Sequence, residues 1–144
     1  MKSFNKRSLL IGSLVAILFI SCKEDEPAPS KTPLLVATSW EVVSYEIGGG
    51  DGTLEVDECE TDNIYTFSSD GSFLVQTGEL KCDETETDAG GSWNFEANES
   101  ILSMRFPGEE ASDWEILELS ENSLRISIYV QIFEAEIVVT MAPI

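Results

Sequence analysis

The sequence predicts an all-β domain from Leu34 onward, an eight-stranded antiparallel up-and-down barrel, with a two-sheet β-sandwich as the alternative. Apolar and polar residues alternate with a period of two over most of this region, which is typical of half-buried strands. Turn sequences such as Ser68–Gly71 and Pro107–Gly108 separate the alternating segments. No segment has helical periodicity over a length that could connect parallel strands. Closure into a barrel would remove the exposed edges that an open sheet keeps.

The first 21 residues have the layout of a secretory signal peptide. Basic residues at Lys2, Lys6 and Arg7 precede an apolar run from Leu9 to Ile20. Twelve helical residues span about 18 Å, which is too short for the roughly 30 Å hydrocarbon core of a bilayer. The segment is therefore predicted to direct export, and not to remain as a membrane-spanning helix.

Cys22 follows this segment directly and is the predicted lipidation site. Residues 19–22 (FISC) resemble the bacterial lipobox, in which the cysteine is acylated and becomes the mature N-terminus. Two or more acyl chains hold a protein stably on a bilayer. The acidic residues 23–26 (KEDE) resemble the surface-export signal of Bacteroidetes-type lipoproteins. These resemblances imply a surface-exposed outer-membrane lipoprotein; the alternatives are a free thiol after ordinary cleavage and an ordinary charged spacer.

Residues 22–33 form a lipidated, acidic and proline-rich tether, and the barrel domain follows as residues 34–144. Within the domain the last two strands have the clearest alternation. They run from Leu124 to Ile132 and from Ala135 to Met141, joined near Phe133. The earlier strands are predicted at about residues 39–47, 62–68, 72–79, 90–96, 100–106 and 112–119.

The two other cysteines, Cys59 and Cys82, are predicted to form a disulfide across one of these hairpins. If residues 70 and 71 are the centre of a two-residue turn, paired positions sum to 141, as 59 and 82 do. A three-residue loop with Gly71 in a left-handed bulge changes the sum to 140 and places Phe67 opposite Phe73. In an exported protein the cysteines are expected to be oxidised. Closing a loop of about 24 residues would stabilise the fold by roughly 3 kcal/mol.

The composition excludes several classes of function. The chain has 27 acidic and 8 basic residues and a net charge of −19 at pH 7, which disfavours binding to nucleic acids and anionic surfaces. It has no histidine, so Ser-His-Asp catalysis, Cys-His catalysis and histidine-ligated zinc are absent. No spacing marks out a catalytic pair of carboxylates. We therefore expect no enzymatic activity and no cofactor.

Several short motifs resemble the small bacterial lipocalin-like domain. They are residues 38–45 (TSWEVVSY), the stretch 62–71 (DNIYTFSSDG) after Cys59, residues 91–95 (GSWNF) after Cys82, and residues 114–120 (WEILELS). The resemblance extends over nearly all of residues 34–144, although Thr38 stands where lipocalins carry the glycine of a Gly-x-Trp motif. It implies an eight-stranded lipocalin-like meander barrel, often anchored as a lipoprotein.

Large apolar side chains at alternating positions are the candidate ligand-binding residues. They could line an apolar cup at the barrel mouth, or they could fill the interior, because eight strands leave barely enough room for either. The candidates are Trp40, Tyr65, Phe67, Phe73, Trp93, Phe95, Met104 and Trp114, and Phe106 shares their pattern.

Acidic runs beside both cysteines form a weaker candidate site. The disulfide would bring these runs to one rim, where carboxylate oxygens could hold Ca²⁺. No Asp-x-Asp-x-Asp-Gly loop is present, and solvated loops also collect carboxylates, so no metal is the main expectation. The calcium candidates are Asp57, Glu60, Asp83 and Glu86.

Together these features predict a lipid-anchored protein of the cell envelope that acts without catalysis. The leading hypothesis is that the barrel mouth binds a small apolar or amphipathic ligand, with the acidic rim selecting polar or cationic head groups. The alternative is a filled barrel that acts as a protein–protein interaction module at the cell surface. An open cavity and a ligand-dependent change in tryptophan emission would distinguish the first from the second.

Overall fold

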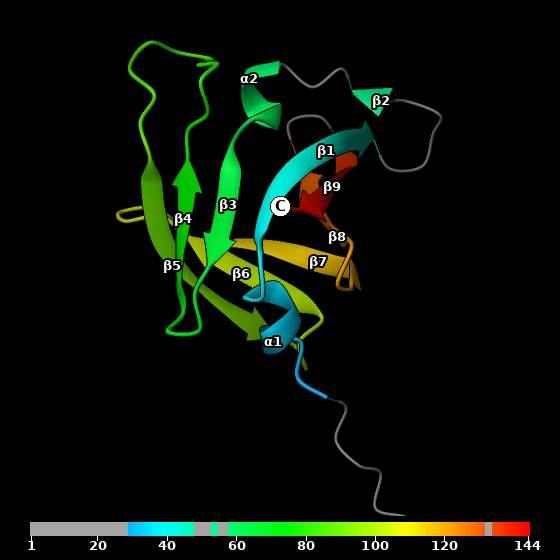
Figure 1. Cartoon of the computed structure of the whole chain (residues 1–144). Helices are drawn as coiled ribbons and strands as arrows, with labels where there is room; N and C mark the ends of the chain where they lie inside the picture. Colours follow the sequence, from blue (N-terminus) through cyan, green and yellow to red (C-terminus); the bar gives the residue numbers. More distant parts are fainter. Residues whose placement is uncertain (1–28, 48–52, 55–57, 132–133) are drawn as a thin grey trace, which may run out of the picture.

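Eight antiparallel strands close into a barrel in the computed structural model, which describes residues 29–47, 53–54, 58–131 and 134–144 (Figure 1). Barrel strands that follow one another in the chain are hydrogen-bonded neighbours, and pairing of β1 with β9 closes the barrel. The predicted up-and-down barrel is confirmed, and the sandwich alternative is not adopted. The strands are β1 (Ser39–Ile47), β2 (Thr53–Leu54), β3 (Ile64–Phe67), β4 (Ser72–Gln76), β5 (Ala89–Glu96), β6 (Ile101–Arg105), β7 (Ser112–Leu119), β8 (Leu124–Val130) and β9 (Ala135–Pro143).

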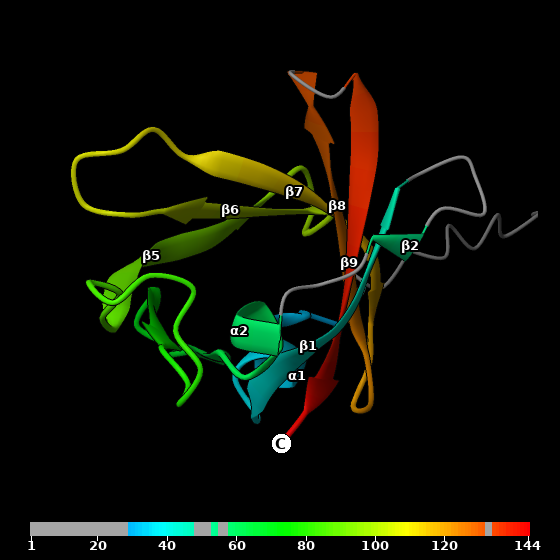
Figure 2. The same ribbon diagram turned by 90° about the horizontal axis from the view of Figure 1, so that it is seen from above.

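Three short elements were not predicted from the sequence. The two-residue strand β2 pairs with the end of β1, outside the eight strands of the barrel. The helices α1 (Thr32–Leu35) and α2 (Glu58–Thr61) are one turn each, too short to produce a periodic pattern. They lie toward opposite ends of the barrel (Figure 1), and Figure 2 shows α2 from above. No described helix has the length and apolar character needed to cross a membrane.

The register of the β3–β4 hairpin follows the three-residue loop. Tyr65 opposes Val75 and Phe67 opposes Phe73, so paired positions sum to 140. Gly71 has a φ angle of +84°, the left-handed conformation that this loop requires and that glycine adopts without steric cost. The predicted pairing of Phe67 with Phe73 is therefore confirmed.

The β3–β4 ladder is shorter than the predicted strands 62–68 and 72–79. Beyond Gln76, backbone N–H groups of the chain bond to side chains of the segment before β3, and no longer to its backbone. Asn63 Oδ1 accepts a hydrogen bond from Gly78 N (3.1 Å), and Asp62 Oδ2 accepts one from Leu80 N (2.8 Å). The chain leaves the sheet here because these side chains satisfy backbone N–H groups that a ladder would otherwise pair. The other predicted strands are confirmed to within about two residues at each end over the described part of the chain.

The core fills the end of the barrel that α1 closes. Leu35 from α1 and Trp40 from β1 are both 0% exposed, and Trp40 Nε1 donates to Leu35 O (3.0 Å). Phe67 and Trp93 pack edge to face with their ring centroids 5.9 Å apart. The alternation of the strands supplies this core, which comprises Leu35, Trp40, Val42, Phe67, Phe73, Trp93, Leu102, Leu124, Ile126, Val139 and Met141.

Glu99 fastens the start of the described chain to the β5–β6 turn. Its carboxylate accepts hydrogen bonds from Lys31 N (2.5 Å) and from the Ser30 hydroxyl (2.8 Å), and Lys31 Nζ donates to Glu99 O (2.7 Å). Ala97, Asn98 and Glu99 have φ angles of 48°, 57° and 62°, a conformation that is costly for most residues other than glycine and asparagine. The contacts of Glu99 offset part of that cost.

Lowering the pH is expected to break this contact. The hydrogen bond from Lys31 N, and then the one from the Ser30 hydroxyl, hold the pKa of Glu99 below its ordinary value of 4.5. Because the folded-state pKa is the lower one, the stabilisation is complete above pH 4.5 and is lost as the pH falls through the folded pKa. The backbone amide resonance of Lys31 should therefore titrate with a midpoint below 4.5. In Glu99→Gln this titration should be absent, whereas a wild-type midpoint at or above 4.5 would contradict the contact.

Candidate ligand-binding site

A cavity of about 480 Å³ lies at the end of the barrel opposite α1, beneath the connection between β4 and β5. Exposed residues at its edge, among them Thr87, Ala89 and Ser112, connect it with solvent. Strands β1, β3, β4, β5, β6 and β7 all contribute to its walls. The lining comprises Tyr45, Asn63, Tyr65, Phe73, Val75, Thr77, Cys82, Glu86, Thr87, Ala89, Met104, Phe106, Ser112 and Trp114.

Phe73 separates this cavity from the packed core. Its side chain is 4% exposed, and its ring centroid lies 5.0 Å from that of Phe106 and 6.1 Å from that of Phe67. Gly91 on the neighbouring strand makes room for the ring, since a Cβ at position 91 would lie 2.6 Å from Phe73 Cε1. The absence of a side chain at Gly91 therefore leaves the space that the Phe73 ring occupies between the core and the cavity.

The walls of the cavity are apolar and aromatic. Tyr65, Met104 and Trp114 face it from three different strands, in the inward positions that the alternation predicts. The indole Nε1 of Trp114 is buried without a hydrogen-bond partner among the described residues. A buried donor without an acceptor is unfavourable by about 1–3 kcal/mol, so an acceptor brought close to this edge of the cavity would be stabilised.

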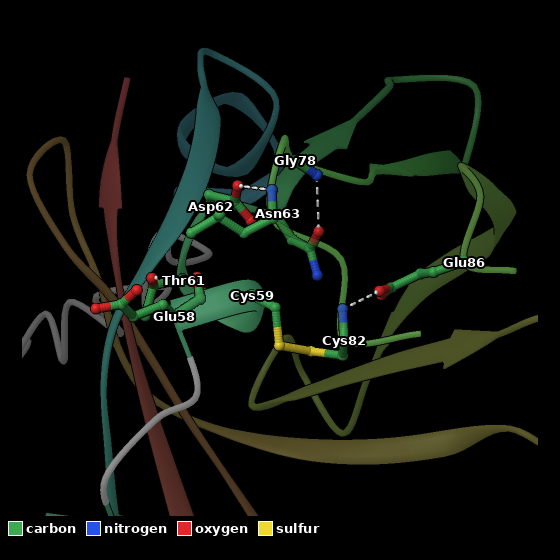
Figure 3. Close-up of a disulfide and its surroundings, with 9 residues drawn as sticks. Glu58, Cys59, Thr61, Asp62, Asn63, Gly78, Cys82 and Glu86 are labelled. Carbon is green, nitrogen blue, oxygen red and sulfur yellow. Dashed lines mark hydrogen bonds between the residues drawn. A yellow bond between two sulfur atoms is a disulfide. The ribbon is translucent and has the colours of Figure 1, made fainter. Parts of the chain in front are cut away.

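A disulfide holds the rim. Cys59 in α2 is bonded to Cys82 in the β4–β5 connection, with Cα atoms 5.2 Å apart, so the predicted disulfide is confirmed (Figure 3). Glu86 Oε2 accepts a hydrogen bond from Cys82 N (2.9 Å). Together with the bonds of Asp62 to Leu80 and of Asn63 to Gly78, these contacts hold the long connection against α2 and β3 (Figure 3).

The structure divides the predicted ligand-binding residues into two groups. Tyr65, Phe73, Met104 and Trp114 line the cavity, and Phe106 joins them. Trp40, Phe67 and Trp93 are buried in the core instead, and half-buried Phe95 packs against Trp93 with ring centroids 5.2 Å apart. Those four residues are outside the cavity lining because they lie nearer the α1 end of their strands.

Sequence reasoning missed several lining residues for identifiable reasons. Tyr45 faces the cavity because the β1–β9 pairing shifts register between Val42 and Ser44, which moves the inward position from residue 44 to residue 45. Val75 follows the alternation from Phe73 and could have been included. Thr87 lies in a connection whose path depends on the disulfide, so no local pattern identifies it; Asn63, Thr77, Ala89 and Ser112 complete the set.

The described residues do not form the predicted calcium site. Among them, no group of three or more His, Cys, Asp or Glu side chains is placed to hold a metal ion. Asp57 and the side chain of Glu60 lie outside the described part of the chain. Asp83 Oδ1 accepts hydrogen bonds from the Thr85 hydroxyl (2.6 Å) and Thr85 N (2.7 Å), which lower its pKa below the ordinary value. These carboxylates serve the loop's own backbone.

The comparisons with known proteins agree with this architecture. Residues 35–126 match the family model of the lipocalin-like domain. Among solved structures, a lipocalin-like protein from Bacteroides uniformis is similar, with a TM-score of 0.55 and 18% sequence identity over 76% of this chain and 98% of that one. No curated protein matches. Because the family model covers more than half of the residues, the chain belongs to the lipocalin-like domain family.

Proposed function

We propose that this protein binds a small apolar or amphipathic ligand in the cavity between Tyr65, Met104 and Trp114. The observation that carries the proposal is the cavity itself, whose volume of about 480 Å³ is typical of small-molecule sites. Its walls are mainly apolar and its rim carries a few polar groups, the combination by which such sites bind and orient a ligand. Membership of the lipocalin-like family supports small-ligand binding in general.

Burial of the ligand's apolar surface would supply most of the affinity. Each 100 Å² removed from water contributes about 2.5 kcal/mol, from which the lost freedom of the ligand is subtracted. The hydroxyl groups of Thr77, Thr87 and Ser112 would contact the polar end of an amphipathic ligand at the rim. The filled-barrel alternative fits the α1 half of the barrel, where the core leaves no comparable space, and does not fit the other half.

The second part of the proposal is the attachment of the protein to the cell envelope through an acylated Cys22, at the outer surface. It rests on the sequence of residues 1–26, because Cys22 and the signal peptide lie outside the described residues. The described chain starts at the α1 end, opposite the cavity, an arrangement that favours uptake of the ligand from the medium.

The Cys22→Ser variant of the protein should be unacylated and absent from the membrane fraction. Retention of this variant in the membrane fraction would contradict the anchor.

Ala89→Trp is expected to block the cavity and abolish ligand binding. Ala89 is exposed in β5 and lines the cavity edge, so an indole at this position would occupy the opening without entering the core. Ser92→Trp is the matched control, because Ser92 lies on the same strand and lines outer grooves only. Native mass spectrometry of the disulfide-bonded protein, incubated with envelope lipid extract, measures the outcome.

Wild type and Ser92→Trp should carry a discrete added mass, and Ala89→Trp should lose it. Binding should also change tryptophan emission, because Trp114 lines the cavity. A bare protein mass in every extract, or equal binding by Ala89→Trp, would contradict the proposed function. The first of these results would leave crosslinking to a protein partner as the next experiment.

A further inference from the structure

We infer that the ligand of this cavity is an organic cation, a molecule with an amine or quaternary ammonium group on an apolar body. This inference rests on the proposed function and adds the charge of the ligand to it. It combines three observations on the described residues: the absence of a positive charge from the cavity lining, the excess of carboxylates at the rim, and the aromatic walls.

Among the described residues, the positively charged side chains of the protein lie outside the cavity lining. Lys31 binds Glu99 O near α1, and Arg125 lies 3.8 Å from Glu46, both outside the lining. Arg105 lines grooves on the outer face of the barrel. Lys81 is at the rim, but its ammonium donates to the backbone oxygen of Glu86 (2.8 Å) and so braces the loop. An anionic ligand would therefore find no charged partner in the lining.

The rim is strongly acidic. In segments 58–63 and 77–88, which the disulfide joins, the described side chains include seven carboxylates and one ammonium. One of these carboxylates, on Glu86, is in the cavity lining itself and is the only charged side chain among the described lining residues. Charges of one sign around an opening attract counter-ions and repel ions of the same sign. This attraction acts over about 10 Å and weakens as salt is added.

The walls suit a cation with apolar substituents better than they suit a metal ion. Aromatic side chains line the cavity from β1, β3, β4 and β7 and from the end of β6; they are Tyr45, Tyr65, Phe73, Trp114 and Phe106. Aromatic faces attract ammonium groups, and the attraction grows when the cation is desolvated. Hard metal ions require several oxygen ligands instead, and the described residues provide no such group. The geometry therefore favours ammonium groups on an apolar body.

The test compares three probes of one chain length: octyltrimethylammonium, 1-octanol and octanoate. Calorimetric titration at pH 7 should give roughly tenfold tighter binding for the ammonium than for octanol, and roughly tenfold weaker binding for octanoate. Glu86→Gln should reduce the preference for the ammonium over octanol by roughly threefold. Glu121→Gln is the matched control, because Glu121 is exposed in the β7–β8 turn, outside the lining, and should leave the preference unchanged. Raising the salt concentration should narrow the differences among the three probes.

Three results would overturn the inference, and they separate it from the proposed function. If octanol binds as tightly as the ammonium and Ala89→Trp removes both, the cavity binds apolar ligands but does not select cations. If Ala89→Trp still binds the ammonium, the acidic surface holds it and not the cavity. If none of the three probes binds although the wild type carries an added mass from lipid extract, the inference fails and the proposed function stands; if the extract adds no mass either, both fail.

Discussion

Trp40→Ala is expected to lower the free energy of unfolding by about 3–5 kcal/mol, the range for truncating a fully buried aromatic side chain. Trp40 is 0% exposed, and it packs in the core beside Leu35, also 0% exposed. Its removal would leave a void at the end of the barrel that α1 closes. It would also leave Leu35 O without the indole N–H that now donates to it at 3.0 Å.

Urea unfolding followed by far-ultraviolet circular dichroism measures this effect. Tyr129→Ala is the control, because Tyr129 is 62% exposed on β8 and its truncation should change stability by less than about 0.5 kcal/mol. A loss below about 1 kcal/mol in Trp40→Ala would show that α1 and Trp40 do not close the barrel as described. Ligand affinity of the folded variant should stay at the wild-type value, since Trp40 is not in the cavity lining. That result would separate Trp40 from the binding role that its sequence pattern predicted.

The pairing of the strands could be predicted because it depends on short-range information. Alternation identifies which residues of a strand face inward, and the loop containing Gly71 fixes how β3 and β4 align. That register places Cys59 and Cys82 at nearly opposite positions, although both lie beyond the β3–β4 ladder, whose last pair is Ile64 and Gln76. The barrel and its disulfide are therefore readable from the sequence.

Depth along the barrel axis could not be predicted in the same way. Trp93 and Ala89 both face inward on β5, but one is 7% exposed in the core and the other is exposed at the cavity edge. The stagger between strands decides which inward residues lie at the same height, and alternation carries no information about it. No local sequence pattern indicates the register shift in β1 that turns Tyr45 inward. The sequence therefore predicted which residues face inward, but it did not distinguish those in the core from those in the cavity.

The second large effect is expected from the double variant Cys59→Ser, Cys82→Ser. The disulfide joins residues 23 apart in the sequence, and loss of such a loop closure lowers the free energy of unfolding by roughly 3 kcal/mol. The effect should extend to the site, because Cys82 lines the cavity and Cys82 N donates to Glu86. We expect the folded variant to bind the ligand more weakly than wild type.

Two measurements test these expectations: urea unfolding and ligand titration. Each compares the double variant with wild type whose disulfide is intact. Asp62→Asn separates the covalent bond from the hydrogen bonds of the same rim, because it weakens the acceptor for Leu80 N and leaves the disulfide in place. If affinity falls in the double variant and not in Asp62→Asn, the disulfide positions the rim. If it falls equally in both, the hydrogen bond from Leu80 N to Asp62 positions the rim as much as the disulfide does. Unchanged stability in the double variant would contradict the loop-closure argument, because no other described contact removes the same freedom from the unfolded chain.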